Sequence, residues 1–243
     1  MHVLSSQRTA RPIQVGGLVP FSSADYPDQL AAVIFIQGCP WRCGYCHNPH
    51  LQARNTGHTQ CWGQVIELLK KRRGLLDAVV FSGGEPTLDP GLYTAIQEVK
   101  TLGYKIGLHT AGIYPRRLQA ILPLLDWVGL DIKTSFTHYD TLTKGKHSHR
   151  GPQDCLRLLQ HSQIAYECRT TLHPALHTPE QIWQLALSLQ AFEVKRFVLQ
   201  QFRTEGCADS YLNHTHIPPS SFPDAELCQA LSGLFQHFEL RTA

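Results

Sequence analysis

Three cysteines lie within eight residues of this 243-residue chain, in the stretch CPWRCGYCHNPH that runs from Cys39 to His50. Cys39, Cys43 and Cys46 form a CxxxCxxC pattern, which is one thiol short of a closed four-ligand metal site. Three thiolates can hold three irons of a cubane iron–sulfur cluster and leave the fourth iron open to a substrate. The same spacing also permits a Cys₃His zinc site, with His47 or His50 as the fourth ligand.

Polar residues also gather at the ends of apolar segments further along the chain. The run Ser82–Glu85 reads SGGE, and its two glycines allow a backbone to approach a ligand closely; a plain strand-to-helix turn is the alternative reading. Asp131 and Lys133 alternate on an expected strand and therefore point to one face. Charges on an inward face are costly unless they bind something polar, whereas at the strand end they can form a surface ion pair.

Apolar segments of two kinds alternate along the chain. Short continuous apolar runs are typical of strands that are buried on both faces. Such runs predict strands at 31–37, 76–81, 104–109, 127–132, 165–172 and 196–202. Helical spacing and capping residues predict helices at about 62–69, 89–103, 115–122, 152–161, 178–192 and 222–238. Strands alternating with helices indicate parallel βαβ units.

The position of the polar motifs indicates the fold class. They come at or just after the carboxyl ends of the expected strands, which converge on one mouth in a barrel but spread along a line in an open sheet. We therefore predict an α/β fold, a partial (β/α)6 TIM-like barrel that forms a single domain over residues 1–243. This domain includes a short N-terminal extension at 1–12 and a C-terminal helix at about 222–238, with no linker or internal repeat.

The composition narrows the class of protein. Hydrophobic residues make up 42% of the chain and charged residues 17%, an ordinary globular balance. The apolar run Ala31–Ile36 is too short to span a bilayer, and the opening residues lack the apolar core of a signal peptide. Scattered Lys and Arg residues carry the net charge of +3, so we expect neither a nucleic acid nor a membrane as partner. We expect a cytoplasmic protein.

The cysteines outside the motif do not predict disulfides in that compartment. They are isolated from one another: Cys61, Cys155, Cys168, Cys207 and Cys228. Isolated cysteines mostly behave as small buried hydrophobic residues, and that is the expectation for these five.

The cysteine pattern, placed after the first strand of an α/β chain, resembles the signature of the radical S-adenosylmethionine (SAM) enzymes. Tyr45 before the last cysteine and His47–Pro49 after it are similar to the enzymes that activate glycyl radical proteins. Further segments resemble the activating proteins of anaerobic ribonucleoside-triphosphate reductases: Gly17–Ser22, Asp25–Pro27, Phe35–Cys39, Phe81–Leu88, Leu130–Lys133, Arg169–Pro174 and Leu199–Arg203. The resemblance covers the chain from Ile13 to about Arg203.

The resemblance implies a cofactor site built from several strand ends. The implied ligands of its [4Fe–4S] cluster are Cys39, Cys43 and Cys46. The residues implied to bind SAM at the open iron are Tyr45, Asn48, Ser82, Gly83, Gly84, Glu85, Thr110, Asp131, Lys133, Arg169 and Arg203. Tyr45 is expected to pack against the adenine, and Glu85 to accept from the SAM ammonium. Arg169 and Arg203 either meet the SAM carboxylate or act as structural ion-pair partners.

One position departs from the activating enzymes. They often read Asp-Thr-Asn-Gly after the third strand, and the Asp is associated with a metal-cation site beside SAM. This chain reads HTAG over His109–Gly112. Because histidine replaces a hard carboxylate ligand poorly, we do not expect that cation site here and keep only Thr110 as a ligand contact.

The implied activity is radical chemistry with no catalytic residues beyond the cluster and SAM. A flavodoxin or ferredoxin reduces the cluster, SAM is cleaved to methionine and a 5′-deoxyadenosyl radical, and this radical removes a hydrogen atom from a glycine of a partner enzyme. The expected partner is anaerobic ribonucleotide reductase. The alternatives are a radical SAM enzyme that modifies a small molecule, peptide or RNA, and a non-catalytic iron–sulfur or zinc-binding module.

Overall fold

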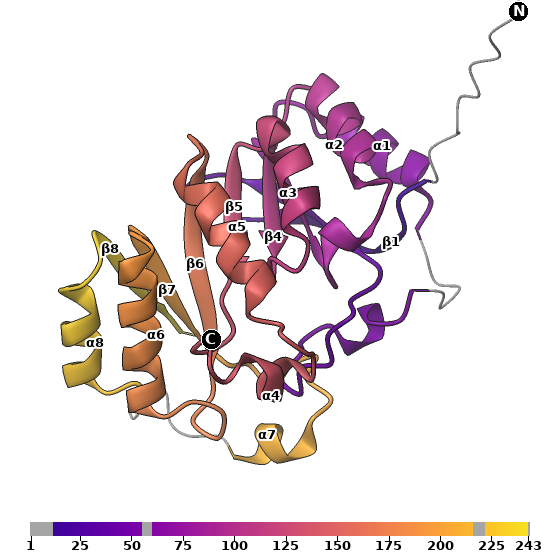
Figure 1. The fold of residues 1–243 in the computed structure, drawn as a ribbon. Helices are drawn as coiled ribbons and strands as arrows, with labels where there is room; N and C mark the ends of the chain where they lie inside the picture. Colours follow the sequence, from indigo (N-terminus) through magenta and orange to yellow (C-terminus); the bar gives the residue numbers. More distant parts are fainter. Residues whose placement is uncertain (1–11, 55–59, 216–221, 243) are drawn as a thin grey trace, which may run out of the picture.

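A single eight-stranded sheet organises the chain, and its strands follow one another in sequence order (Figure 1). The computed structural model describes residues 12–54, 60–215 and 222–242. The expected N-terminal extension, 1–12, therefore lies outside the described residues except for its last position. The strands are β1 (Val15–Ser22), β2 (Ala31–Ile36), β3 (Ala78–Gly83), β4 (Lys105–Thr110), β5 (Trp127–Asp131), β6 (Ala165–Leu172), β7 (Arg196–Gln201) and β8 (His237–Arg241).

All neighbouring strands are parallel except β1, which pairs with β2 in antiparallel orientation. Strands β2 to β7 are the six strands expected from the sequence. The partial barrel of six βα units is thus confirmed, with one further strand at each edge. We missed β1 because Gly16, Gly17 and Pro20 weaken the strand pattern, and edge strands tolerate such residues.

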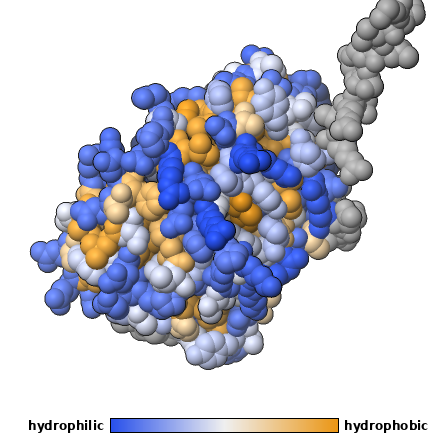
Figure 2. All heavy atoms as spheres, in the orientation of Figure 1, coloured by the Kyte–Doolittle hydropathy of each residue, from blue (hydrophilic) through white to orange (hydrophobic). Residues whose placement is uncertain are grey.

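Helices cover one side of the sheet (Figure 1). Their bounds are α1 (Trp62–Lys71), α2 (Leu92–Thr101), α3 (Pro115–Ile121), α4 (Tyr139–Thr143), α5 (Arg150–Gln160), α6 (Pro179–Ala191), α7 (Ser210–His214) and α8 (Ala225–Ser232), with 3₁₀ turns η1 (Pro49–Leu51), η2 (Pro86–Leu88) and η3 (Leu122–Leu124). Figure 2 shows a face on which apolar residues form separate islands among hydrophilic ones. Among the helices described, none is long and apolar enough to cross a membrane.

The C-terminal element corrects the prediction of a helix over 222–238. Helix α8 ends at Ser232, and residues 237–241 form β8 beside β7. Phe238 and Leu240 pack against the main core, as alternate residues of a strand do. Apolar residues spaced three or four apart extend the helical period past Ser232, and they hid the two-residue period of a five-residue strand.

Each face of the sheet buries its own apolar cluster. On the helix-covered face, the large core includes the fully buried Ile34, Phe81 and Leu108. The inner face carries a smaller cluster of Tyr26, Ala31, Val33, Ala78, Val80 and Trp127. Tyr26 comes from the loop between β1 and β2, and its ring centroid lies 5.2 Å from that of Trp127. This loop therefore fills the inner face near the amino end of β5 and leaves the carboxyl ends of the strands to the polar residues.

Candidate functional site

A pocket opens at the carboxyl ends of the parallel strands, where the sequence motifs were expected to converge. Its lining consists of Cys39, Trp41, Cys43, Tyr45, Cys46, His47, Asn48, Gln52, Ser82, Gly83, Gly84, His109, Thr110, Ala111, Asp131, Lys133, Arg169 and Thr171. Every residue predicted to bind the cluster or SAM lines this pocket except Glu85 and Arg203. The fold thus brings together residues that lie up to 132 positions apart in the sequence, from Cys39 to Thr171.

Backbone contacts hold in place the loop after β2 that carries Cys39, Cys43 and Cys46, which we call the cysteine loop. Gly38, with φ 105°, turns the chain, and its N–H donates to the Leu51 carbonyl at 2.7 Å. The Cys39 N–H donates to the Gln52 carbonyl at 3.1 Å, so the loop closes on its own far end. The side chain of Gln37, the residue before Gly38, also donates to the Ala53 carbonyl at 2.6 Å.

The three motif thiols are free and face the same pocket. Burial raises the pKa of Cys39 to about 12 and also raises the pKa of Cys43, although the Lys133 ammonium lowers both. The free thiols of Cys39 and Cys43 are therefore protonated at neutral pH, and a metal must displace their protons to bind. Three partly exposed thiols on one loop suit a cluster, in which each thiolate binds a different iron.

The zinc alternative fits the geometry less well. The His47 ring donates from Nε2 to the Arg203 carbonyl at 2.9 Å, which removes that nitrogen from the metal ligands. His50 is exposed and lies outside the pocket lining. Among the residues that the structure describes, no three His, Cys, Asp or Glu side chains are arranged to hold one metal ion.

The two glycines of the SGGE run serve a close approach between two loops. A Cβ on Gly83, which has φ 119°, would lie 2.3 Å from the Ile36 nitrogen. One on Gly84 would lie 2.4 Å from the Gly38 oxygen. The Glu85 N–H also donates to the Gly38 carbonyl at 2.8 Å. The SGGE turn is thus fastened directly to the cysteine loop, while both glycines also line the pocket.

Glu85 was expected to accept from a SAM ammonium, and that role stays a prediction. Its carboxylate is fully buried and accepts from the Thr87 hydroxyl at 2.5 Å, the Thr87 N–H at 3.1 Å, the Thr110 hydroxyl at 2.7 Å and the Ala111 N–H at 2.8 Å. Burial raises the pKa of Glu85, and these hydrogen bonds oppose the shift. The carboxylate therefore ties the turns after β3 and β4 together and does not reach the pocket.

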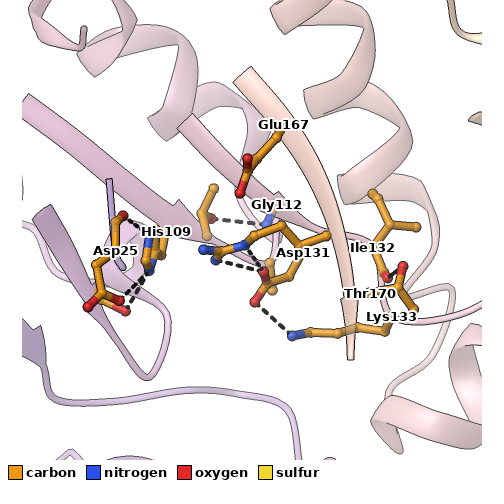
Figure 3. Close-up of polar contacts among 12 residues, drawn as sticks. Asp25, His109, Gly112, Asp131, Ile132, Lys133, Glu167 and Thr170 are labelled. Carbon is orange, nitrogen blue, oxygen red and sulfur yellow. Dashed lines mark hydrogen bonds and ion pairs between the residues drawn. The ribbon is translucent and has the colours of Figure 1, made fainter. Parts of the chain in front are cut away.

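Asp131 connects two cations in the pocket wall (Figure 3). Its Oδ2 accepts from Lys133 Nζ at 3.0 Å, and its Oδ1 accepts from Arg169 Nε at 2.9 Å and Nη2 at 2.8 Å. Burial would raise the pKa of Asp131, but Arg169 and Lys133 outweigh it and hold the pKa well below its usual value. The group carries one net positive charge beside the pocket, which suits an anionic ligand. Arg169 is both an ion-pair partner and a pocket residue.

His109 replaces the carboxylate that the activating enzymes often carry at this position. Its Nε2 donates to the Asp25 carbonyl at 2.8 Å, and Nδ1 lies 3.4 Å from the Ser82 hydroxyl (Figure 3). Burial, followed by the charge of Arg169, lowers the pKa of His109 to about 4. The ring is therefore neutral at pH 7, with Nδ1 as an acceptor. The absence of a cation site beside SAM stays a prediction.

Tyr45 carries the clearest sign that the pocket takes a ligand. Its side chain is 4% exposed and lines the pocket, yet the phenol oxygen has no hydrogen-bond partner. Buried polar atoms in proteins are nearly always hydrogen-bonded, so an unpartnered one at a pocket wall indicates a partner supplied by a bound molecule. The Lys133 ammonium lies 5.8 Å from the Tyr45 ring centroid, at the same wall.

Arg203 has an exposed side chain that does not line the pocket, and its expected role as a contact of the SAM carboxylate or as an ion-pair partner stays a prediction. Only its carbonyl takes part, as the acceptor for His47. The following turn packs on the cysteine loop: a Cβ on Gly206 would lie 2.3 Å from the His47 oxygen, and the Cys207 thiol donates to the Gly44 carbonyl at 3.6 Å.

Sequence reasoning missed several members of the pocket wall, namely Trp41, Gln52, Ala111 and Thr171. Thr171 could have been found, because it lies two residues after Arg169 on β6 and so shares its face. The others reach the pocket through loop geometry, which has no periodic signal in the sequence.

Comparisons with known proteins agree with this geometry. Residues 33–194 match the Radical SAM superfamily. A protein of Methanocaldococcus jannaschii named as a glycyl-radical enzyme activating enzyme is 29% identical over 213 residues, which cover 84% of this chain and 86% of that protein. The pyruvate formate-lyase-activating enzyme of Clostridium pasteurianum is 32% identical over 165 residues, 65% of this chain and 68% of that enzyme.

Solved structures share the fold at low sequence identity. SuiB of Streptococcus suis, bound to its precursor peptide SuiA, superposes with a TM-score of 0.69 at 14% identity, over 86% of this chain and 48% of SuiB. QueE from Escherichia coli superposes with a TM-score of 0.55 at 14% identity, over 95% of this chain and 93% of QueE.

Proposed function

Because the chain belongs to the radical SAM superfamily and to its glycyl-radical-enzyme activating branch, we propose that it generates a glycyl radical on a partner enzyme, and that this partner is an anaerobic ribonucleotide reductase. One observation carries the proposal. Three free thiols, a buried phenol without a hydrogen-bond partner and a charged group from two further strands meet in one pocket. Enzymes of this superfamily use a [4Fe–4S] cluster and SAM, and these side chains suit both.

The cluster ligands in this proposal are Cys39, Cys43 and Cys46. Once bound, the cluster and SAM supply a one-electron reductive cleavage of SAM, which gives a radical able to remove a hydrogen atom from a glycine Cα. The loop itself contributes placement, because its backbone contacts fix the three thiols relative to the strand ends. Loading releases protons, since burial keeps the free thiols of Cys39 and Cys43 protonated.

The remaining pocket residues bind and orient SAM. Lys133 and Arg169 together carry one more charge than Asp131, which suits the carboxylate of SAM. Tyr45 offers its ring to the adenine and its phenol to a polar group of the ligand. Asn48 adds an amide from the same loop.

The incomplete barrel offers a route for the partner. Over the residues that the structure describes, the sheet runs from β1 to β8 without closing on itself. A glycine-bearing loop can enter through this side opening and reach the pocket at the strand ends. The reductase is favoured over other partners by the segments Gly17–Ser22 and Asp25–Pro27, which form β1 and the loop that fixes His109. A flavodoxin or ferredoxin supplies the electron, and we place the reaction in the cytoplasm.

Anaerobic reconstitution with iron and sulfide tests the cofactor assignment. We expect about four irons per chain and 5′-deoxyadenosine after reduction with SAM. Cys46→Ala should lose the cluster and the cleavage together, whereas Cys61→Ala, which changes an exposed thiol outside the pocket, should keep both. Bound zinc without cleavage of SAM would refute the proposal.

Electron paramagnetic resonance tests the partner. Mixing the reduced enzyme with SAM and anaerobic ribonucleotide reductase from the same host should give a glycyl radical doublet. SAM cleavage without a radical on any glycyl radical enzyme of the host would instead favour an enzyme that modifies a small molecule, peptide or RNA.

A further inference from the structure

A group of exposed cations lies beside the cysteine loop. We call it the cationic rim and define it as Arg42, Lys144, Lys146 and Arg150, all of which are exposed. Arg42 belongs to the cysteine loop, Lys144 and Lys146 belong to the loop between α4 and α5, and Arg150 is the first residue of α5. The Arg42 N–H donates to the carbonyl of Thr143, the last residue of α4, at 3.1 Å, which joins the two loops directly. Figure 1 shows α4 at the same end of the molecule as α7, the helix that follows the turn over the cysteine loop.

Hydrogen bonds fix the shape of this loop. Asp140 accepts from the His147 N–H at 2.8 Å and from the Ser148 N–H and hydroxyl, both at 2.7 Å. The Thr143 hydroxyl donates to the Ser148 hydroxyl at 2.8 Å, and Ser148 is buried. Gly145 packs close to the indole nitrogen of Trp41, a pocket residue. The cations are therefore carried on a preformed surface that is attached to the pocket wall.

In the sequence around the cationic rim, acidic residues do not balance the basic ones. The sequence has no acidic residue between Asp28 and Glu67 or between Asp140 and Asp154, and these intervals contain the whole rim and the cysteine loop. Asp140 lies in α4 beside this loop, and its carboxylate accepts from the backbone N–H groups of His147 and Ser148. Other acidic residues near the cysteine loop, Glu205 and Asp209, belong to the turn on its other flank.

We infer that the cationic rim is the docking surface for an acidic one-electron carrier protein that reduces the cluster. This inference rests on the proposed function, since it needs a reducible cluster on the cysteine loop. A carrier seated on the rim lies beside that loop, whose thiols are partly exposed. Electron-transfer encounters are small and short-lived, and opposite charges speed them by steering the collision. A group of exposed cations on a hydrogen-bonded backbone next to the cysteine loop meets both requirements.

Stopped-flow reduction of the reconstituted full-length enzyme tests the rim. The probes are an acidic flavodoxin and an acidic [2Fe–2S] ferredoxin, both pre-reduced, and photoreduced 5-deazaflavin serves as an uncharged small reductant. The test variant is Lys144→Glu with Lys146→Glu, two exposed positions with no role in the pocket. The matched control is Lys71→Glu with Lys195→Glu, which makes the same charge change at the amino ends of the strands.

At low ionic strength we expect the test variant to be reduced about tenfold or more slowly by at least one acidic carrier, and the control variant to match the wild type. The difference should shrink as salt rises from about 0.02 M to about 0.5 M, because the screening length falls. Both variants should react equally with 5-deazaflavin and form equal amounts of 5′-deoxyadenosine. Radical formation on the reductase after 5-deazaflavin reduction should also be unchanged.

Two outcomes would overturn the inference while leaving the proposed function intact: reduction by both carriers without salt dependence, or equal slowing in test and control variants. No reduction by either acidic carrier would overturn the inference together with the assignment of a flavodoxin or ferredoxin as electron donor, and would leave SAM cleavage and radical transfer as proposed. A loss of radical yield on the reductase, with normal carrier reduction, would assign the rim to the glycyl radical enzyme instead. A protein that assembles no cluster, or cleaves no SAM even with 5-deazaflavin, would refute the proposed function itself.

Discussion

Replacing Asp131 with Asn tests whether the pocket wall depends on one carboxylate. In the wild type, Asp131 contacts Lys133 at 3.0 Å and Arg169 at 2.8 Å, and the Lys133 and Arg169 side chains are only 16% and 8% exposed. Asp131→Asn leaves two nearly buried cations without a counter-charge. Removing one partner of a buried ion pair lowers the free energy of unfolding by about 3–5 kcal/mol. Because Asp131 itself is 30% exposed and the amide keeps one acceptor, we expect the lower end, about 3 kcal/mol.

Urea unfolding of the cluster-free protein, followed by circular dichroism, measures this loss in the free energy of unfolding. For a chain of this size, about 3 kcal/mol corresponds to a fall in Tm of about 6–12 °C. The pKa of Asp131 is depressed in the folded state, so the carboxylate stabilises the fold above the unfolded pKa of about 4. The advantage of the wild type should therefore be complete at pH 7 and should shrink as pH falls below about 4.

A double-mutant cycle supplies the control. Arg169→Met removes one of the cations, so adding Asp131→Asn to it should cost less than in the wild-type background, with a coupling of about 1–3 kcal/mol. A loss below about 1 kcal/mol for Asp131→Asn, or additive effects in the cycle, would refute the view that Asp131 holds these cations in place.

Three further changes probe the loops and the pocket. Gly84→Ala places a Cβ 2.4 Å from the Gly38 oxygen, so iron loading after reconstitution should fall at least about twofold, while Gly63→Ala, whose nearest neighbour is 3.8 Å away, should load normally. Tyr45→Phe removes only an unpartnered hydroxyl, so the free energy of unfolding of the cluster-free protein should stay within about 0.5 kcal/mol of the wild type. The Kd for SAM should rise about fivefold, as expected for the loss of one hydrogen bond. Because the folded pKa of His109 is about 4, the folded state binds fewer protons than the unfolded state below about pH 6.5. Between pH 7 and pH 5, the free energy of unfolding measured in urea should therefore fall by about 2 kcal/mol more in the wild type than in His109→Gln. Equal pH slopes would show that His109 is not buried as a neutral ring.

The regular part of the fold was accessible from the sequence because its signals are local. Strands such as Ala31–Ile36 are continuous apolar runs, and the capping box of Thr178 and Gln181 marks the start of α6. The strands at the edges of the sheet were harder to predict from the sequence. Helix-like spacing continues past the end of α8 into β8, and the short strand there is defined mainly by its pairing with β7.

The residues of the candidate site likewise divide into those with a local signal in the sequence and those without one. Cys39 and Asp131 were found because their spacing along one loop or strand determines where they point. The buried position of Glu85 behind the pocket lining could not be predicted, because its four donors belong to Thr87, Thr110 and Ala111, and a buried network of this kind has no signature in the chain order. The contact of Arg203 with His47 could not be predicted either, because it is made by the carbonyl, which is common to every residue type.

The fastening of the cysteine loop has a consequence for cluster repair. Its backbone is held by Leu51 and Gln52 on one side and by the SGGE turn on a second, and its His47 ring donates to the Arg203 carbonyl on a third. Little further ordering is then needed when iron arrives, because the loop's conformational entropy is already lost on folding. An enzyme that loses iron on exposure to air would retain a template for reloading, so its recovery would depend on iron, sulfide and reductant rather than on refolding.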